Sequence, residues 1–151
     1  MSTMSKTDAN ISENKNNILI TLLASICSLG PLATDMYLPA LPQMTLDFAT
    51  TPSIIQLTLT SWLIGLAIGQ VIAGPLSDIY GRTRPLVFGL IIFTISSVAC
   101  IFAPSIELFI FARFIGGFAA SSALVVSRAI ASDIYKGTML TKFLATVMII
   151  Q

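Results

Sequence analysis

Two charged side chains lie inside apolar segments of the sequence, Asp35 in the first and Arg113 in the fourth. A charged group at bilayer depth is costly, so such residues usually face a cavity or a partner and mark ion or substrate pathways. Pro31, Pro39 and Pro42 surround Asp35, and Pro39 cannot donate a hydrogen bond to the Asp35 carbonyl. An acid beside an interrupted helix is typical of ion-coupled binding sites. We therefore expect Asp35 to bind an ion or substrate; the alternative is an interfacial acid at a ragged helix end.

Arg113 lies about 12 Å into the fourth apolar segment, at 1.5 Å of rise per residue. Asp35 has a similar depth, because its helix runs in the opposite direction. A lone guanidinium at that depth needs an anion, and Asp35 is the carboxylate at the same level. The sequence therefore predicts a functional pair, or alternating partners, with a structural brace as the alternative.

Polar side chains also recur at helical spacing in the first two apolar segments. In the first, Ser28 falls near the same helical face as Asp35. In the second, Gln56, Thr60 and Gln70 form one stripe. These side chains are candidates for the wall of a substrate cavity.

The segment between the second and third apolar runs carries paired charges. Asp78 lies near the C-terminal end of its helix, where the helix dipole disfavours an anion. Arg82, four residues later, compensates that charge, and Gly81 lets the chain turn tightly. Asp133 creates the same problem at the end of the fourth run. Together with the second arginine, Arg84, these residues predict an ionic lock on one face of the membrane.

The elements that position these residues must be membrane helices. Of the 151 residues, 55% are hydrophobic and 10% are charged, and the mean hydropathy is +0.89. A soluble chain carries roughly 25% charged residues. A helix needs about 20 apolar residues to cross the bilayer core. The sequence thus predicts an all-α membrane protein, with a polar tail at 1–16 and an incomplete transmembrane domain at 17–151. Spans are expected at 17–40, 53–77, 85–103 and 105–131, with the start of a fifth at 142–151.

The basic residues predict the orientation of these spans. Lysines or arginines occur in the tail, between spans two and three, and after span four, whereas the two other loops contain none. Because basic loops stay in the cytoplasm, we expect a multi-pass protein of the cell's inner (plasma) membrane with a cytoplasmic N-terminus.

Several classes of function are excluded. The sequence has no histidine and two cysteines, which argues against a metal site, and we expect no cofactor and no enzymatic activity. A net charge of +1 argues against a nucleic-acid partner. No GxxxxGK[ST] or GxGxxG motif is present.

Three motifs carry a family resemblance. The inner loop resembles the Major Facilitator Superfamily signature G-x-L-x-D-x-x-G-[RK]-x-[RK], matched by Gly74, Leu76, Asp78, Gly81, Arg82 and Arg84. Residues 29–42 are similar to the span-one signature of the drug:proton antiporter branch, and residues 113–117 to its R-x-x-Q-G motif. The sequence most resembles the bicyclomycin/chloramphenicol resistance (Bcr/CflA) type.

This resemblance implies twelve spans in two six-helix halves, with substrate and proton sites between the halves. The chain would then be an N-terminal fragment that needs the missing C-terminal half. The resemblance also implies that Asp35 titrates, that Arg113 modulates it, and that Asp78, Arg82 and Asp133 latch the inner gate.

The expected function is therefore that of the N-terminal part of a proton-coupled multidrug efflux transporter, which exports small amphipathic or apolar compounds. Its partners would be a drug-like small molecule, protons and the lipid bilayer. One alternative is an uptake or metabolite carrier of the same superfamily. Another is a complete four-helix small membrane protein, either a dimeric pump or a scaffold.

Overall fold

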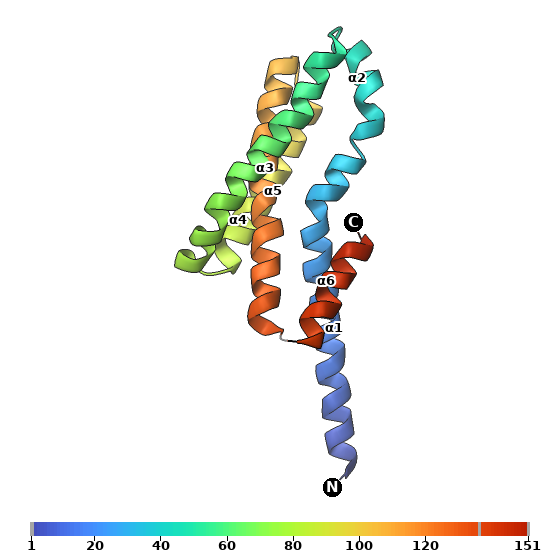
Figure 1. Cartoon of the computed structure of the whole chain (residues 1–151), viewed down its shortest axis with the longest axis vertical. Coiled ribbons are helices and arrows are strands. Elements are labelled where there is room, and N and C mark those ends of the chain that lie inside the picture. The colour runs from blue at the N-terminus through green and yellow to red at the C-terminus, as the bar shows by residue number, and fades with distance from the viewer. Residues whose placement is uncertain (1, 136, 151) are drawn as a thin grey trace.

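The computed structural model describes the backbone of residues 2–135 and 137–150, together with the side chains of residues 18–135 and part of 137–149. Helices and turns make up this part of the chain, and it contains no strand (Figure 1). The helices are α1 (Ser2–Asp35), the short 3₁₀ helix η1 (Leu38–Ala40), α2 (Leu41–Asp47), α3 (Pro52–Tyr80), α4 (Thr83–Ile101), α5 (Ile106–Ile134) and α6 (Thr138–Ile150).

Four of these segments are long and apolar enough to cross a membrane, namely Ile18–Asp47, Pro52–Tyr80, Thr83–Ile101 and Ile106–Ile134. The all-α membrane fold predicted from the composition is thus confirmed. The end of the first segment differs from the expected single span over 17–40. There α1 stops at Asp35, and two short helices follow, each with a proline, Pro39 or Pro42, in its first turn. Proline is tolerated in a first turn because no intrahelical donor is needed there.

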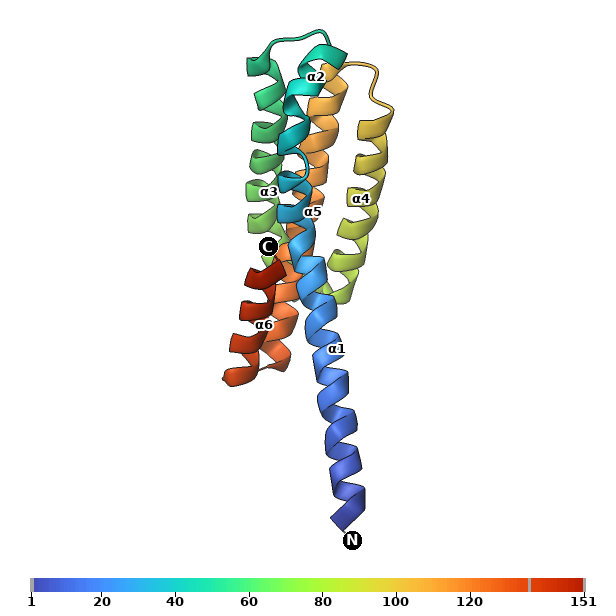
Figure 2. The ribbon, with the colours of Figure 1, turned by 90° about the vertical axis from the view of Figure 1, so that its right-hand side faces the viewer.

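Helix α5 lies at the centre of the bundle and packs against α3, α4 and α1 (Figures 1 and 2). Glycine allows the closest of these approaches. A Cβ atom added at Gly117 of α5 would lie 2.2 Å from the Trp62 carbonyl oxygen of α3. A Cβ atom at Gly65 of α3 would lie 2.2 Å from the Phe114 carbonyl oxygen of α5. The two backbones therefore touch, as small residues at membrane-helix interfaces permit.

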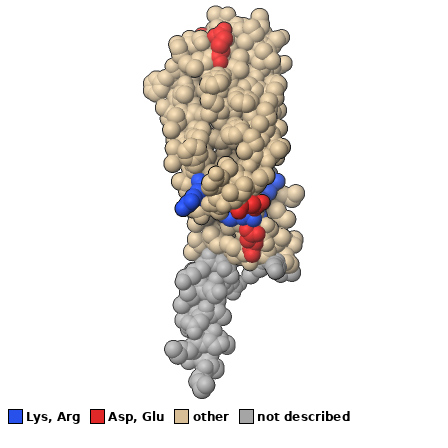
Figure 3. Space-filling model, turned by 90° about the vertical axis from the view of Figure 1, so that its left-hand side faces the viewer, with Lys and Arg blue, Asp and Glu red and all other residues tan. Residues whose placement is uncertain are grey.

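Helix α6 packs mainly against α1, beside the lower half of the bundle in Figures 1 and 2. Ala24 and Cys27 of α1 and Phe143 and Val147 of α6 belong to one buried cluster. The charged residues on the face in Figure 3 gather in a band towards one end, and the surface above that band is almost uncharged. We call this end, where α3 turns into α4, the Arg82 end, and the opposite end the α2 end.

Candidate functional site

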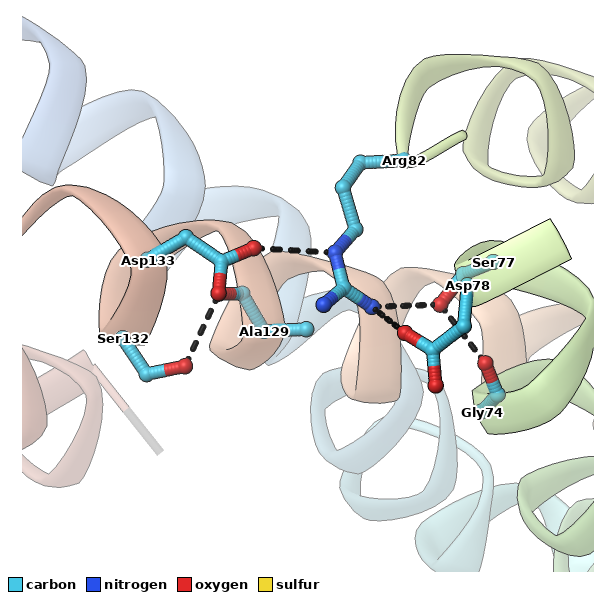
Figure 4. A network of polar contacts seen from close by, with 7 residues as sticks. All are labelled: Gly74, Ser77, Asp78, Arg82, Ala129, Ser132 and Asp133. Carbon is cyan, nitrogen blue, oxygen red and sulfur yellow. Dashed lines mark hydrogen bonds and ion pairs between the residues drawn. The ribbon is translucent and has the colours of Figure 1, made fainter. Parts of the chain in front are cut away.

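The first candidate site is an ionic cluster at the Arg82 end. Arg82 Nη1 lies 2.6 Å from Asp78 Oδ1, and Arg82 Nε lies 2.9 Å from Asp133 Oδ2 (Figure 4). Arg82 Nη1 also donates a hydrogen bond of 2.8 Å to Ser77 Oγ. The bond to Asp133, followed by the attraction of both carboxylates, raises the pKa of Arg82 above its usual range. One guanidinium thus bridges α3 and α5.

The turn between α3 and α4 places this guanidinium. Helix α3 ends at Tyr80, and Gly81 has φ 83°, a conformation that residues with side chains rarely adopt. This turn sets Arg82 directly before α4, opposite the last turn of α5 that carries Asp133. Gly74 contributes its carbonyl oxygen, which accepts a hydrogen bond from Ser77 Oγ at 2.8 Å (Figure 4).

Arg84 does not join this cluster. Its side chain is exposed at the start of α4, and within the described part of the chain both ion pairs are made by Arg82. The structure therefore brings Asp78, Arg82 and Asp133 together and leaves the second arginine of the loop outside.

The second candidate site surrounds Arg113 in the half of the bundle towards α2. The guanidinium carbon Cζ of Arg113 lies 3.8 Å from the ring centroid of Tyr37. It lies 5.5 Å from the ring centroid of Phe109 and 5.7 Å from that of Trp62. Cation–π attraction to these aromatic faces stabilises the half-buried cation. The Arg113 Nε atom is buried and has no hydrogen-bond partner among the described residues.

Asp35 and Arg113 do not form the ion pair that their depths suggested. Asp35 is exposed at the end of α1, and neither ion pair between described side chains includes it. Tyr37, two residues further on, turns inwards to 6% exposure and places its ring against the guanidinium. Similar depth is not enough for contact, because two helical residues also need matching rotation about their axes.

A hydrogen bond fixes the position of Tyr37. Its hydroxyl group pairs with Thr58 Oγ1 of α3, and Thr58 donates its own proton to the Ile55 carbonyl oxygen at 2.5 Å. The Tyr37 hydroxyl is therefore the donor in the pair. This bond ties the segment after α1 to α3 and keeps the tyrosine ring over Arg113.

These side chains line a cavity of about 380 Å³. Arg113, Tyr37, Trp62 and Phe109 form part of its wall, and the other lining side chains come mainly from α4, including Cys100. None of the described residues that line the cavity is a carboxylate. Its wall is therefore apolar and aromatic, with a single positive charge.

The other predicted cavity residues lie elsewhere. Ser28 is buried, and its hydroxyl donates to the Ala24 carbonyl oxygen at 2.9 Å. Gln56, Thr60 and Gln70 are exposed on α3, on a face that the described helices do not cover. This stripe and the Arg113 cavity are separate surfaces.

Sequence reasoning gave no role to Tyr37, Thr58 or Trp62. All three are buried, and each contacts Arg113 or holds a residue that does. An aromatic residue in an apolar run packs equally well against lipid or against a cation. The available sequence signal was that Tyr37 lies two residues after Asp35. That spacing does not predict that the Tyr37 side chain turns into the bundle.

Comparison with known proteins identifies the family. The Major Facilitator Superfamily profile matches residues 22–151. The chain is 46% identical, over 87% of its length, to an uncharacterized MFS-type transporter, YdgK, of Bacillus subtilis, and covers 33% of that protein. It is 40% identical, over 78% of its length, to a chloramphenicol resistance protein of Pseudomonas aeruginosa, and covers 28% of it. A bicyclomycin resistance protein homolog of Haemophilus influenzae is 31% identical over 88% of the chain, which covers 33% of that protein.

No solved structure matches the sequence. The chain spans about a third of the length of the curated relatives it matches. The profile match covers nearly all of the chain, and the four membrane-length helices agree with it. The chain belongs to the Major Facilitator Superfamily of multi-pass membrane transporters.

Proposed function

We propose that this chain acts as the N-terminal third of a proton-coupled exporter of small amphipathic or apolar compounds. The observation that carries the proposal is Arg113, a half-buried charged side chain in a membrane-length helix that lines a cavity. A charged residue inside a membrane span is retained for function more often than for stability. The names of the Pseudomonas and Haemophilus relatives, which refer to chloramphenicol and bicyclomycin resistance, support export of drug-like compounds.

In this proposal Asp35 is the proton-binding carboxylate and Arg113 controls its charge state. The two side chains are apart in the present conformation. In another conformation of the transport cycle they form a pair, and Asp35 then loses its proton. A carboxylate that binds a proton in one state and releases it in the other has the differential affinity that coupling requires.

The ionic cluster at the Arg82 end is proposed to latch the inner gate. Asp78, Arg82 and Asp133 form the latch itself, while Gly81 sets its turn and Gly74 supports Ser77. Arg84, which is exposed, is proposed to meet lipid headgroups or a part of the protein beyond this chain. Exposed ion pairs contribute little to stability, so this cluster can separate and re-form at low cost.

The other predicted cavity residues and the orientation in the membrane complete the proposal. Ser28, Gln56, Thr60 and Gln70 are candidates for the wall of a central cavity shared with the other two thirds of the protein. The protein lies in the cell's plasma membrane, with the N-terminus and the Arg82 end in the cytoplasm. The exposed polar stripe on α3, formed by Gln56, Thr60 and Gln70, supports the proposal that a polar surface of the complete protein faces this side of α3.

Substitution of Asp35 by Asn in the complete protein tests proton coupling. Asn keeps the shape of the side chain but cannot be charged, so Asp35→Asn should abolish drug efflux driven by a pH gradient while drug binding persists. Efflux is measured in everted membrane vesicles with an imposed gradient. Asp47→Asn is the control, because Asp47 is also an exposed acid in the first membrane segment, but it lies in α2 and accepts a hydrogen bond of 3.0 Å from Gln43 Nε2. An Asp35→Asn protein that still concentrates drug against its gradient would remove Asp35 from the mechanism.

The direction of flux separates export from the alternative, an uptake or metabolite carrier of the same superfamily. The same vesicles, loaded or unloaded with drug, give the direction directly. Accumulation in everted vesicles when their interior is acidic supports export. Proton-driven movement of the compound in the opposite direction would favour the carrier.

A further inference from the structure

Two hydrogen-bond donors in the Arg113 cavity lack acceptors. Among the described residues, three buried side-chain polar atoms have no hydrogen-bond partner: Trp62 Nε1, Arg113 Nε and Ser127 Oγ. The first two belong to residues that line the same cavity. Buried polar groups are nearly always paired, so two unpaired nitrogen donors from residues of the same cavity need an explanation. Indole and guanidinium nitrogens can only donate, and the missing partner is therefore an acceptor.

No described polar group of the cavity accepts a hydrogen bond from either donor, and the hydroxyl groups of the cavity donate elsewhere. Ser96 and Ser97 already donate to the carbonyl oxygens of Ala112 and Phe93, at 2.7 Å and 2.8 Å. The Tyr37 hydroxyl donates to Thr58. All three hydroxyl protons are thus used within the protein, and the unpaired nitrogen donors left for an incoming molecule belong to Trp62 and Arg113.

The remaining wall fits an apolar body. Phe109 and Tyr37 provide aromatic surface, and Ile101 and Met44 provide aliphatic surface. The volume of about 380 Å³ lies within the range of about 300–1,000 Å³ typical of small-molecule pockets. Arg113 Cζ is 5.7 Å from the Trp62 ring centroid, so the two residues are neighbours in the cavity wall.

We propose that this cavity is a substrate subsite for compounds that join an aromatic or apolar body to an uncharged or anionic oxygen acceptor, such as a nitro, carbonyl or carboxylate group. The subsite rests on the proposed export function and names its substrate class. The acceptor lies between Trp62 Nε1 and Arg113 Nε, and the body lies against the aromatic wall. Permanent cations are excluded, because the wall carries a guanidinium and no carboxylate among its described residues.

Equilibrium binding to the purified complete protein tests the subsite with two labelled probes. Chloramphenicol is uncharged and carries nitro and amide oxygens on a benzene ring. Tetraphenylphosphonium is aromatic but cationic and has no acceptor. Trp62→Phe keeps an aromatic ring and removes the N–H donor, so chloramphenicol should bind about tenfold more weakly, the effect of one lost hydrogen bond. Binding of tetraphenylphosphonium should not weaken.

Leu63→Ala is the matched control, because Leu63 is the next residue of α3 and is 49% exposed. It should bind both probes as the unaltered protein does. Unchanged chloramphenicol affinity in a folded Trp62→Phe protein would overturn the subsite. An equal loss of both probes would also overturn it, since that result indicates a general packing defect rather than a lost donor.

A measurement on the unaltered protein keeps the proposal testable if Trp62→Phe does not fold. Cys100 lines the cavity and is half-buried, whereas Cys27 is buried away from it, between α1 and α5. Chloramphenicol should slow alkylation of Cys100 by N-ethylmaleimide several-fold, measured by mass spectrometry of the Cys100 peptide, and should leave Cys27 unchanged. Equal rates at Cys100 with and without saturating chloramphenicol would overturn the subsite.

These readouts separate the subsite from the export function on which it rests. A protein that protects Cys100 but moves no drug in vesicles supports the subsite and overturns export. A protein that exports chloramphenicol without protecting Cys100, and whose Trp62→Phe variant binds it normally, overturns the subsite and leaves export standing.

Discussion

Arg82 is the residue whose contacts most clearly link sequence to mechanism. Its guanidinium bonds to Asp78 on one side and Asp133 on the other, so a single cation serves two carboxylates from different helices. Asp78 and Asp133 both lie near helix C-termini, where the helix dipole makes a nearby cation favourable. Since the pKa of Arg82 is raised, its charge persists through the physiological range, and separation of the cluster requires movement of the helices rather than loss of the Arg82 proton.

We predict that Arg82→Gln impairs transport by the complete protein and that Arg84→Gln does not impair it as strongly. Gln cannot hold two carboxylates at once, whereas Arg84 makes neither of the described ion pairs. Initial drug efflux rates of the two variants, normalised to membrane expression, check this. Equal rates in both variants would contradict a latch at Arg82, and Asp78→Asn should also impair transport because it removes one of the two ion pairs of Arg82.

The residues around Arg113 show how far sequence reasoning reaches at this scale. Hydropathy gave the depth of Asp35 and Arg113, because depth follows from position within an apolar run. It did not give their rotation, and the structure places Tyr37 rather than Asp35 against the guanidinium. The charged cluster was easier to anticipate, since Asp78 and Arg82 are four residues apart and helix-end electrostatics specify the pairing.

Helix α5 can lie at the centre of the bundle because many of its buried residues are small. Its buried positions include Gly116, Gly117, Ala119 and Ala120, and these let α3 and α4 approach closely. Glycine and alanine are the residues that membrane helices use at such contacts, so this close packing follows from the residue types. The end of the first span was less predictable, because prolines are compatible with a kink, a turn or a new short helix.

We predict that Gly117→Ala destabilises the fold and that Gly74→Ala does not. A Cβ atom at position 117 would collide with the Trp62 backbone, whereas one at position 74 meets nothing within 4 Å. Overpacking of this kind typically costs about 1–3 kcal/mol. Thermal aggregation of the purified complete protein measures the difference. A Gly117→Ala protein as stable as the Gly74→Ala protein would mean that α3 and α5 can separate without loss.

At the scale of the whole molecule, the charge distribution defines two different ends. Arg82 and Arg84 lie at one end with Asp78 and Asp133. Towards the opposite end, the charged side chains visible in Figure 3 are acidic. By the positive-inside rule, this distribution supports the proposed cytoplasmic position of the arginine end.

Cysteine labelling tests this orientation in intact cells. In a complete protein without its native cysteines, Thr50→Cys should react with a membrane-impermeant maleimide added outside. Arg84→Cys should react only after the membrane is permeabilised. Both positions are accessible in the described structure, since Thr50 is half-buried and Arg84 is exposed. The reverse pattern would invert the proposed topology and place the Arg82 cluster on the outer face.

The final prediction concerns the 151-residue chain by itself. Large apolar side chains are exposed on every long helix, and on α6 Met148 and Ile149 are 79% and 85% exposed. Alternating access requires one bundle to rock against another around a shared site, and the relatives are about three times as long as this chain. The isolated chain, purified into liposomes, should therefore show no drug-dependent proton flux with a pH-sensitive dye, while the complete protein in matched liposomes does. Flux from the isolated chain would mean that these helices transport without a second bundle, or pair with a copy of themselves to form one.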